Sequence, residues 1–388
     1  MVHSWYSGNQ VDLLETGSEF FPALLHAIEH ATQEIHLETY IFRIDSASQP
    51  IAMALAAAAQ RGVRCYVLVD GFGSRDFPEQ WQQRFQATGV EFLFFRPERL
   101  RWLPRRNRLR RLHRKLAMID GTIAFVGGIN LHHDLDDAEP HFLPRYDYAV
   151  RLRGPIVLPI YQTIKKMWRR ERWLRGSIAP VPRLIPTQQP AGELNVRFLT
   201  RDNVRHRQSI EIEYLKELHS ARREIIIANA YFLPGFRFRH AIKHAAQRGV
   251  KVKILLQGRV DHAIFYYATR VLFRDFLREG VEIYEYRAGF LHAKVAIVDG
   301  LWATVGSSNI DPFSLMLAQE ANVVVKNHLF ADHLRDRVVT RIEQYSRPVH
   351  LLRLRHAHWL ERSLMWCCYA FVRAAVGIAG LGQRYFRG

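Results

Sequence analysis

The feature that most constrains this sequence is a motif that occurs twice. HRKLAMIDGTIAFVGGIN runs from His113 to Asn130, and HAKVAIVDGLWATVGSSN runs from His292 to Asn309. Both copies keep His, Lys, Asp, Gly and Asn at the same internal spacing, while most other positions exchange apolar and small residues. Such a repetition is improbable as an accident. The sequence therefore predicts two similarly folded halves in which the repeated polar residues have a function.

The repeat extends beyond this motif. AAQRGVRCYVLVDG (58–71) is echoed by AAQRGVKVKILLQG (245–258), and EIHLETYIF (34–42) more loosely by EIIIANAYF (224–232). Helical stretches alternate with short β-branched runs in the same order in both halves, which is typical of sheets covered by helices. We predict an α/β fold of two similar domains, each a mixed β-sheet flanked by helices, related by a pseudo-twofold axis.

A proline-rich segment separates the halves. Four prolines fall between residues 176 and 194, and such a segment cannot continue a helix or a central strand. We assign residues 1–176 to the first domain, 177–194 to a linker, 195–346 to the second domain and 347–388 to a basic and apolar C-terminal tail. Two such domains facing each other would each supply half of one active site, and two separate sites are the alternative.

Strand alternation places the His and the Lys of each motif on one face, so the two side chains can point together into a site. The second strand of each motif closes with a short polar pair that is suited to binding an anion. The candidate catalytic set is His113, Lys115, Asp120, His292, Lys294 and Asp299. The candidate supporting set is Gly128, Asn130, Asp147, Ser307, Asn309 and Glu320.

These residue types suit the chemistry of a phosphate ester. The lysines would bind non-bridging oxygens and stabilise the charge of a five-coordinate transition state, and the asparagines would add neutral donors. One His would attack phosphorus while the other protonates the departing alcohol. The roles would reverse when an incoming alcohol displaces the phosphoryl group. This chemistry needs neither a metal nor a cofactor, and we assign none.

A nucleophilic imidazole needs a partner that orients its other nitrogen. Asp120 and Asp299 have the wrong strand parity for this task, so we interpret them as structural anchors within the motif. Asp147 in RYDYAVRL and Glu320 in AQEANVVV open strand-like runs at comparable places in the two halves. We assign these two carboxylates as the imidazole orienters.

Other signals are weaker. His132, His133 and Asp134 could suggest a metal site, but they follow the motif in a polar stretch that favours surface residues. DGFGS (70–74) lacks the GxxxxGK[ST] pattern of a nucleotide-binding loop and is interpreted as a loop. Three cysteines, two of them adjacent, exclude a disulfide framework and a tetrahedral zinc set built from cysteines.

The repeated segments resemble a known family. HRKLAMID and HAKVAIVD, with GGIN and GSSN, are similar to the paired HxKxxxxD motifs of the phospholipase D superfamily. Together with SWYSGNQVDLLETG, QRGVRCYVLVDGFGS and EIIIANAYFLPGFRF, they resemble bacterial cardiolipin synthases, most closely the B type, from about residue 4 to about residue 345.

That resemblance implies a phosphatidyl transfer. Phosphatidylglycerol, or another diacyl phospholipid such as phosphatidylethanolamine, would donate its phosphatidyl group to a His. The hydroxyl of phosphatidylglycerol or a free alcohol such as glycerol would accept it, without CTP or ATP. The family's catalytic roles fall on His113, Lys115, Asn130, His292, Lys294 and Asn309. The resemblance does not say which His is the nucleophile.

The charge balance indicates an anionic partner. There are 55 Lys and Arg against 37 Asp and Glu, a net charge of +18. Residues 99–115 interleave basic residues with Leu and Trp, and 164–176 mixes them with Trp168 and Trp173. Basic charge beside Trp favours an anionic phospholipid membrane over nucleic acid. The alternatives are a hydrolytic phospholipase D, a nuclease of the same family and a catalytically silent membrane scaffold.

The two ends of the chain bear on location. LMWCCYAFVRAAVGIAGLG (364–382) approaches the length of a spanning helix, but a central Arg373 costs about 2.5 to 3.5 kcal/mol on insertion scales. An interfacial or re-entrant segment is favoured over a true span, and a packed amphipathic helix is the remaining alternative. The N-terminus shows no cleaved signal peptide. We expect a peripheral protein of the bacterial inner membrane, on its cytoplasmic face.

Overall fold

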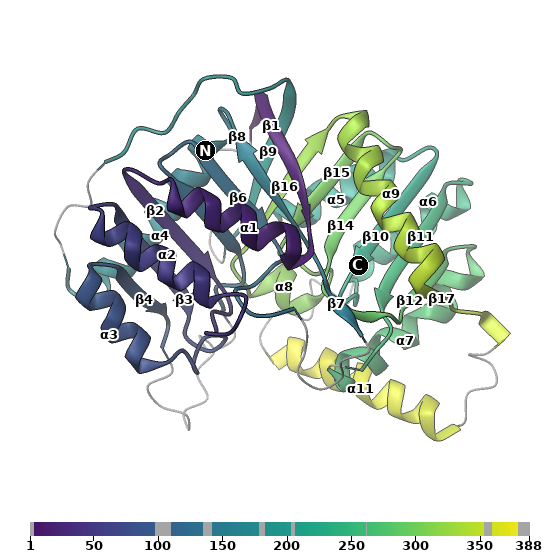
Figure 1. Ribbon diagram of the computed structural model, residues 1–388. Coiled ribbons are helices and arrows are strands. Elements are labelled where there is room, and N and C mark those ends of the chain that lie inside the picture. Colours follow the sequence, from purple (N-terminus) through teal and green to yellow (C-terminus); the bar gives the residue numbers. More distant parts are fainter. Residues whose placement is uncertain are drawn as a thin grey trace.

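The computed structural model describes residues 4–97, 110–134, 142–177, 183–202, 206–260, 262–352 and 359–378. Its two halves lie side by side and consist of the same kinds of element (Figure 1). The first half contains β1 (Trp5–Glu15), α1 (Thr16–Glu29), β2 (Glu34–Thr39), α2 (Gln49–Gln60), β3 (Arg64–Asp70), α3 (Glu79–Thr88), β4 (Glu91–Phe95), β5 (Lys115–Ile119), β6 (Ile123–Gly127), β7 (Leu143–Tyr146), β8 (Tyr148–Arg153) and α4 (Val157–Trp173).

The second half follows the same order, with three differences among the described residues. It contains β9 (Leu194–Arg201), α5 (Ser209–Ser220), β10 (Glu224–Asn229), α6 (Phe236–Gln247), β11 (Lys251–Gln257), α7 (Ala263–Arg278), β12 (Glu282–Tyr286), β13 (Gly289–Leu291), β14 (Lys294–Val298), β15 (Trp302–Gly306), α8 (Pro312–Met316), β16 (Glu320–Lys326), α9 (His328–Tyr345), β17 (Ser346–Pro348) and α11 (Trp359–Ile378). β13 lies before its hairpin, where β7 follows the hairpin of the first half, α8 is inserted before β16, and β17 and α11 are added at its end.

One mixed sheet of 15 strands runs through both halves, in the order β17-β12-β11-β10-β14-β15-β16-β9-β1-β8-β6-β5-β2-β3-β4. Outward from the antiparallel β1–β9 pair, the strands on the two sides correspond one to one, and only β17 has no counterpart. β2, β3 and β4 are parallel to one another, as are β10, β11 and β12, while β5 and β14 join them antiparallel. The prediction of two similar α/β domains related by a pseudo-twofold axis is confirmed.

Helices cover both faces of the sheet, which explains why the strands are apolar along most of their length. α1, α2 and α3 pack on one face of the first half, and α5, α6 and α7 pack on the corresponding face of the second. α4 and α9 cover the opposite face and share one core that spans both halves. Ile225 and Ile226, neighbours on β10, therefore belong to different cores, as strand alternation requires.

The described part of the predicted linker, residues 183–193, runs along the first half. The amide of Leu184 donates to Tyr161 Oη at 3.1 Å, and that of Ala191 donates to the carbonyl of Gly8 at 2.8 Å. At the other boundary, β17 pairs with β12, so sheet pairing continues as far as Pro348, slightly beyond the assigned end of the second domain.

The aspartates of the repeated motif form hairpin turns. Asp120 and Gly121 have φ of 50° and 63°, and Asp299 and Gly300 have φ of 54° and 63°. Two consecutive residues with positive φ are what a type I′ two-residue turn demands, and Asp-Gly is a preferred pair there. These turns join β5 to β6 and β14 to β15, which explains locally why DG recurs in both motifs.

α11 contains residues 364–378 of the predicted C-terminal segment 364–382. Residues 379–382 lie outside the described residues. Tyr369, Val372 and Val376, at helical spacing, are buried in the core formed with α7, whereas Trp366 and Phe371 are exposed. One face of α11 is thus packed, and the opposite face is apolar and open to solvent. Across the described residues, no helix combines the length and apolarity needed to cross a membrane.

The sequence has two segments that mix basic and aromatic residues, 99–115 and 164–176. Most of the run 99–115 lies outside the described residues, since 98–109 are not described. In α4 the expectation that Trp168 faces a membrane is wrong, because Trp168 is 1% exposed and packs against the ring of Tyr66 at 5.1 Å. Trp173, at the end of α4, is exposed.

Candidate active site

Each histidine of the repeated motif meets a carboxylate from the other half of the molecule. His113 Nδ1 lies 3.0 Å from Oε1 and 3.2 Å from Oε2 of Glu320. His292 Nδ1 lies 2.6 Å from Oδ2 of Asp147. Because both carboxylates occupy Nδ1, the Nε2 atom of each ring is left for chemistry. The structure brings the four residues together as one composite arrangement, with each half completing the other's imidazole.

Backbone hydrogen bonds hold each histidine beside the carboxylate of the other half. The amide of His113 donates to the carbonyl of Gln319 at 3.0 Å, and the amide of His292 donates to the carbonyl of Tyr146 at 2.8 Å. Gln319 and Tyr146 immediately precede Glu320 and Asp147. Each His is therefore held in register beside the carboxylate that contacts its ring. The short parallel pair β7–β13 extends this contact on the His292 side.

The lysines of the motifs lie beneath the histidines and are buried. Lys115 Nζ donates to the carbonyl of His113 at 2.6 Å. Lys294 Nζ lies 2.7 Å from His292 Nδ1 and 3.4 Å from Asp147 Oδ2, so the three groups form one buried cluster. Lys294 is 0% exposed and Lys115 is 5% exposed. Two cations held this deep are positioned to compensate an anion bound beside the histidines.

The difference between Gly128 and Ser307 has a steric explanation. A Cβ added at Gly128 would come within 2.3 Å of Asp147 Oδ1, so the shorter carboxylate of the first half needs a residue without a side chain there. In the second half, Ser307 Oγ donates to Oε2 of Glu320. A hydroxyl thus supports the longer carboxylate where a glycine makes room for the shorter one.

The two asparagines follow the second strand of each motif, at the end where the lysines stand. In the first hairpin Lys115 pairs with Gly127, three residues before Asn130. In the second hairpin Val295, next to Lys294, pairs with Val305, four residues before Asn309. Asn130 is 5% exposed and its Oδ1 accepts from the amide of Ile41 at 3.2 Å. Asn309 is 3% exposed, and its Oδ1 has no partner among the described residues.

Burial shifts the titration of the site. It lowers the pKa of Lys115 to about 7 and that of Lys294 to about 8, against the partial compensation of the nearby carboxylates. Burial also lowers the pKa of both histidines, and the charge of Lys294 adds to this effect at His292. A neutral imidazole is the form that can act as nucleophile or base.

Asp120 and Asp299 belong to the candidate catalytic set, but the structure does not bring them to this site. Asp120 accepts hydrogen bonds from the amides of Thr32, Gln33 and Glu34, ahead of β2. Asp299 accepts hydrogen bonds in the same way from the amides that lead into β10. Both lie at the end of the hairpin opposite the His, where they tie the turn to the neighbouring strand.

Sequence reasoning missed a second pair of residues that hold the histidine strands. Asp70 Oδ2 accepts from the amide of Leu112 at 2.7 Å, and Gln257 Oε1 accepts from the amide of Leu291 at 3.0 Å. Leu112 and Leu291 directly precede the two histidines. The signal was present, because Asp70 and Gln257 occupy the same place in the repeated segments LVDG and LLQG.

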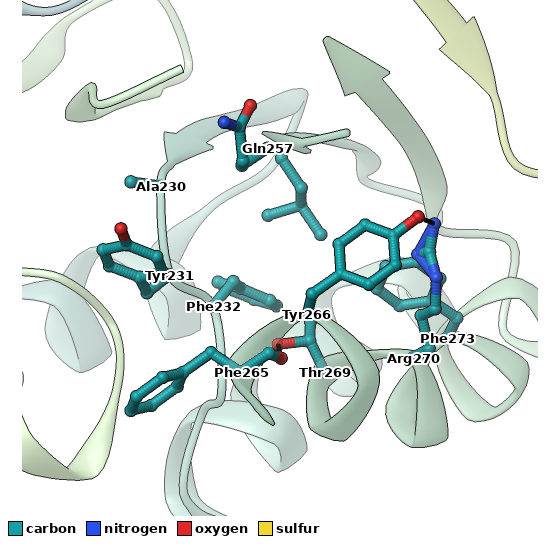
Figure 2. Close-up of a pocket in the computed structure, with 10 residues that line it drawn as sticks. Ala230, Tyr231, Phe232, Gln257, Phe265, Tyr266, Thr269, Arg270 and Phe273 are labelled. Atoms are coloured by element: carbon teal, nitrogen blue, oxygen red, sulfur yellow. Dashed lines mark hydrogen bonds between the residues drawn. The ribbon is translucent and has the colours of Figure 1, made fainter. Parts of the chain in front are cut away.

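Gln257 also borders a pocket of the second half. Figure 2 shows Gln257 opposite the aromatic side chains that α7 contributes, among them Phe265, Tyr266 and Phe273. Arg270 donates a hydrogen bond to the hydroxyl of Tyr266. None of the residues that line this pocket belongs to the candidate set, so it lies beside the second half of the site rather than at the histidines.

Tyr40 was also missed. Its ring centroid is 4.9 Å from that of His113, and Lys115 Nζ lies 5.5 Å from the same ring. The expectation for His132 is wrong, since this residue is 8% exposed, with Nδ1 2.8 Å from the carbonyl of His133. Among the described residues, no group of three His, Cys, Asp or Glu side chains could hold a metal ion.

Comparison with known proteins identifies the fold and the family. A family model described as "Cardiolipin synthase, PLD-like domain" matches residues 24–135 and 214–340, one segment in each half. The structure is similar to the crystal structure of phosphatidylserine synthase from Haemophilus influenzae Rd KW20, with a TM-score of 0.71 at 15% identity, covering 96% of this chain and 95% of that one. At that identity the similarity concerns the fold.

Two curated proteins are closer in sequence. Cardiolipin synthase B of Escherichia coli strain K12 is 40% identical over 391 residues, covering 98% of this chain and 92% of the relative. Cardiolipin synthase A of Pseudomonas putida strain W619 is 30% identical over 338 residues, covering 87% of this chain and 69% of the relative. With both motif-bearing halves matched by the family model, this chain belongs to the cardiolipin synthase family of PLD-like proteins.

Proposed function

We propose that this protein synthesises cardiolipin by moving a phosphatidyl group from one phosphatidylglycerol to the hydroxyl of a second. It is a phosphatidyltransferase by family, with 40% identity to cardiolipin synthase B over nearly the whole of both chains. The observation that carries the mechanism is the exchange of carboxylates between the halves, Glu320 on His113 and Asp147 on His292. This arrangement supplies two oriented imidazoles to one phosphorus atom.

The first step forms a covalent phosphohistidine. Nε2 of one His attacks the phosphorus of the donor lipid, and the bond from phosphorus to the oxygen of the headgroup glycerol breaks. The other His, in its protonated form, gives its proton to the departing glycerol. The carboxylate on Nδ1 of the attacking ring stabilises the positive charge that the ring acquires when it bonds to phosphorus. Free glycerol leaves.

The second step reverses these roles. The second His, now neutral, takes the proton from a hydroxyl of the acceptor phosphatidylglycerol as its oxygen attacks phosphorus. The phosphorus–nitrogen bond breaks and cardiolipin is released. Lys115 and Lys294 stabilise the non-bridging oxygens in both steps, and Asn130 and Asn309 add neutral donors. One phosphodiester replaces another, so the exchange needs no nucleotide.

We also propose that the reaction takes place on an anionic membrane, at the cytoplasmic face. The substrates are phospholipids, and the net charge of +18 favours such a surface. α11, in the proposed tail 347–388, exposes a row of large apolar side chains: Trp359, Leu360, Leu364, Trp366 and Phe371. Apolar side chains of this size on a protein with a net positive charge suit the boundary between headgroups and acyl chains.

The direct test is to incubate the purified protein with radiolabelled phosphatidylglycerol vesicles, in EDTA and without nucleotide, and to separate the lipids. We expect cardiolipin and glycerol, and no turnover in the His113→Ala variant. Phosphatidic acid as the sole product would indicate a hydrolytic phospholipase D instead. Absence of any lipid product, with phosphatidylethanolamine also supplied, would refute lipid transfer and direct attention to DNA as the diester.

A further inference from the structure

Arg145 stands beside the second motif and has no counterpart beside the first. It lies on β7, and the carbonyl of the next residue, Tyr146, accepts the amide hydrogen of His292 at 2.8 Å. Because Asp147 and Glu320 correspond in the two halves, the position equivalent to Arg145 is Ala318. On the His113 side no arginine stands at this position, and the buried Arg201 of β9 instead donates to the carbonyls of Leu315 and Ala318.

The side chain of Arg145 is held by packing. Its guanidinium carbon lies 5.8 Å from the ring centroid of Phe290, which is two residues before His292. Its Nε is buried and has no hydrogen-bond partner among the described residues. The amide of Arg145 donates to the carbonyl of Asp134 at 2.9 Å, and Asp134 Oδ2 accepts from the amide of Gly17 at 2.6 Å. The charge of Arg145 lowers the pKa of Asp134, but burial outweighs it. A half-buried guanidinium in this state is a suitable receptor for an anion.

A second arginine joins it around the same ring. Arg259 stacks on Phe142 at 3.3 Å and lies 4.8 Å from the centroid of Phe290. In the first half the corresponding contact is that of Arg111 with Phe72, at 4.6 Å. Arg111 takes the place of Phe290 in the repeat, and Phe72 takes the place of Arg259. Each half therefore keeps one arginine–phenylalanine stack beside its histidine strand.

The surroundings of the two stacks differ in charge. Arg111 lies 4.0 Å from the buried carboxylate of Asp70, whereas the position equivalent to Asp70 in the second half is the neutral Gln257. The Arg259 stack therefore has a neutral amide where the Arg111 stack has a carboxylate. The donor lipid has a single phosphate, which reacts, so it offers no second anion to such a subsite.

We propose that Arg145, supported by Arg259, binds the phosphate of the acceptor lipid. The inference rests on the proposed function, because an acceptor phosphatidylglycerol carries an anionic phosphate joined through glycerol to the hydroxyl that reacts. A neutral alcohol carries none. The fork of a guanidinium matches a phosphate in a bidentate manner, and Lys reproduces the charge without that geometry. Arg145 is thus a specificity-determining residue for a lipid acceptor.

The test uses one donor and two competing acceptors. The full-length protein receives labelled phosphatidylglycerol in mixed micelles with excess ethanol, and the ratio of cardiolipin to phosphatidylethanol is measured. We expect this ratio to fall at least tenfold in Arg145→Ala and in Arg145→Gln, with phosphatidylethanol formation retained. Arg145→Lys should lie between these variants and the wild type. Arg84→Ala removes an exposed arginine from a cation–π contact with Trp81 on α3 and should leave the ratio unchanged.

Other results would overturn the inference. An equal fall in both products in variants with the wild-type melting temperature would mean that Arg145 acts on the reacting groups and not on the acceptor. An unchanged ratio in both neutral variants would mean that the acceptor phosphate binds elsewhere. If the wild type formed neither product, the proposed function itself would fail, independently of Arg145.

Discussion

At the scale of single residues, the two buried lysines are the groups whose titration we expect to control substrate binding. Removing an ammonium group from water disfavours its charged form, which is why burial lowers the pKa of Lys115 to about 7 and of Lys294 to about 8. Only the protonated lysine attracts the phosphodiester oxygens. The free enzyme therefore loses its two cations one after the other as the pH rises.

This gives a pH prediction. The value of kcat/KM for transfer to ethanol should fall as the pH rises through about 7 and again through about 8, because each lysine loses its proton there. In Lys115→Arg, whose guanidinium keeps its proton throughout this range, the first fall should disappear. Initial rates at low substrate concentration, measured at each pH, give kcat/KM for the wild type and the variant. A kcat/KM that is flat across both values would contradict the assignment of the lysines as titrating anion binders.

At the scale of elements, α11 has one face packed in the core and another that exposes large apolar side chains, and we propose that the exposed face contacts the membrane. Its inner face packs on α7 through Tyr369, Val372 and Val376, and Trp366 and Phe371 on other faces are 60% and 61% exposed. Exposed apolar side chains of this size are costly in water and favour insertion between lipid headgroups. The two faces can therefore be separated by mutation.

The prediction for α11 compares these faces. Trp366→Ser with Phe371→Ser should weaken sedimentation with phosphatidylglycerol vesicles about tenfold or more, since each aromatic side chain contributes on the order of 1.5 to 3 kcal/mol when it leaves water. The melting temperature should not change. Val372→Ala, the matched buried change, should instead cost about 1 to 2 kcal/mol of folding stability and leave binding intact. Unchanged sedimentation of the double variant would exclude α11 as the membrane contact.

At the scale of the whole molecule, the site exists only because the two halves meet. The ring of His113 is completed by Glu320 and that of His292 by Asp147, across sequence separations of 207 and 145 residues. The continuous sheet through β1 and β9 fixes the relative position of the halves. Neither half has an oriented imidazole of its own, so the molecule should possess one site and not two.

Single-site behaviour can be tested with two variants. His113→Ala and His292→Ala should each lower cardiolipin formation by at least 10³-fold, because nucleophile and acid are both needed in each turnover. An equimolar mixture of the two variants should remain inactive if the site is completed within one chain. Retention of about half of the activity by either variant would indicate two independent sites.

Much of this could be predicted from the sequence because a repeat is a local pattern. Two similar α/β halves, the candidate histidines and lysines, and the place of Asp147 and Glu320 at strand starts all follow from spacing and alternation within short segments. The DG turns follow equally, since positive φ at two consecutive positions selects few residue pairs. For His132 and Trp168 the local context misled, because burial depends on which elements pack above them.

What the sequence by itself determined is the set of chemical groups and the twofold character of the fold. The tertiary structure alone decided which carboxylate serves which histidine, that Gly128 makes room for Asp147, and that Arg145 lies on one side only. The physical reason is that these relations depend on strand register and docking between segments more than a hundred residues apart. No periodicity within either segment records that geometry.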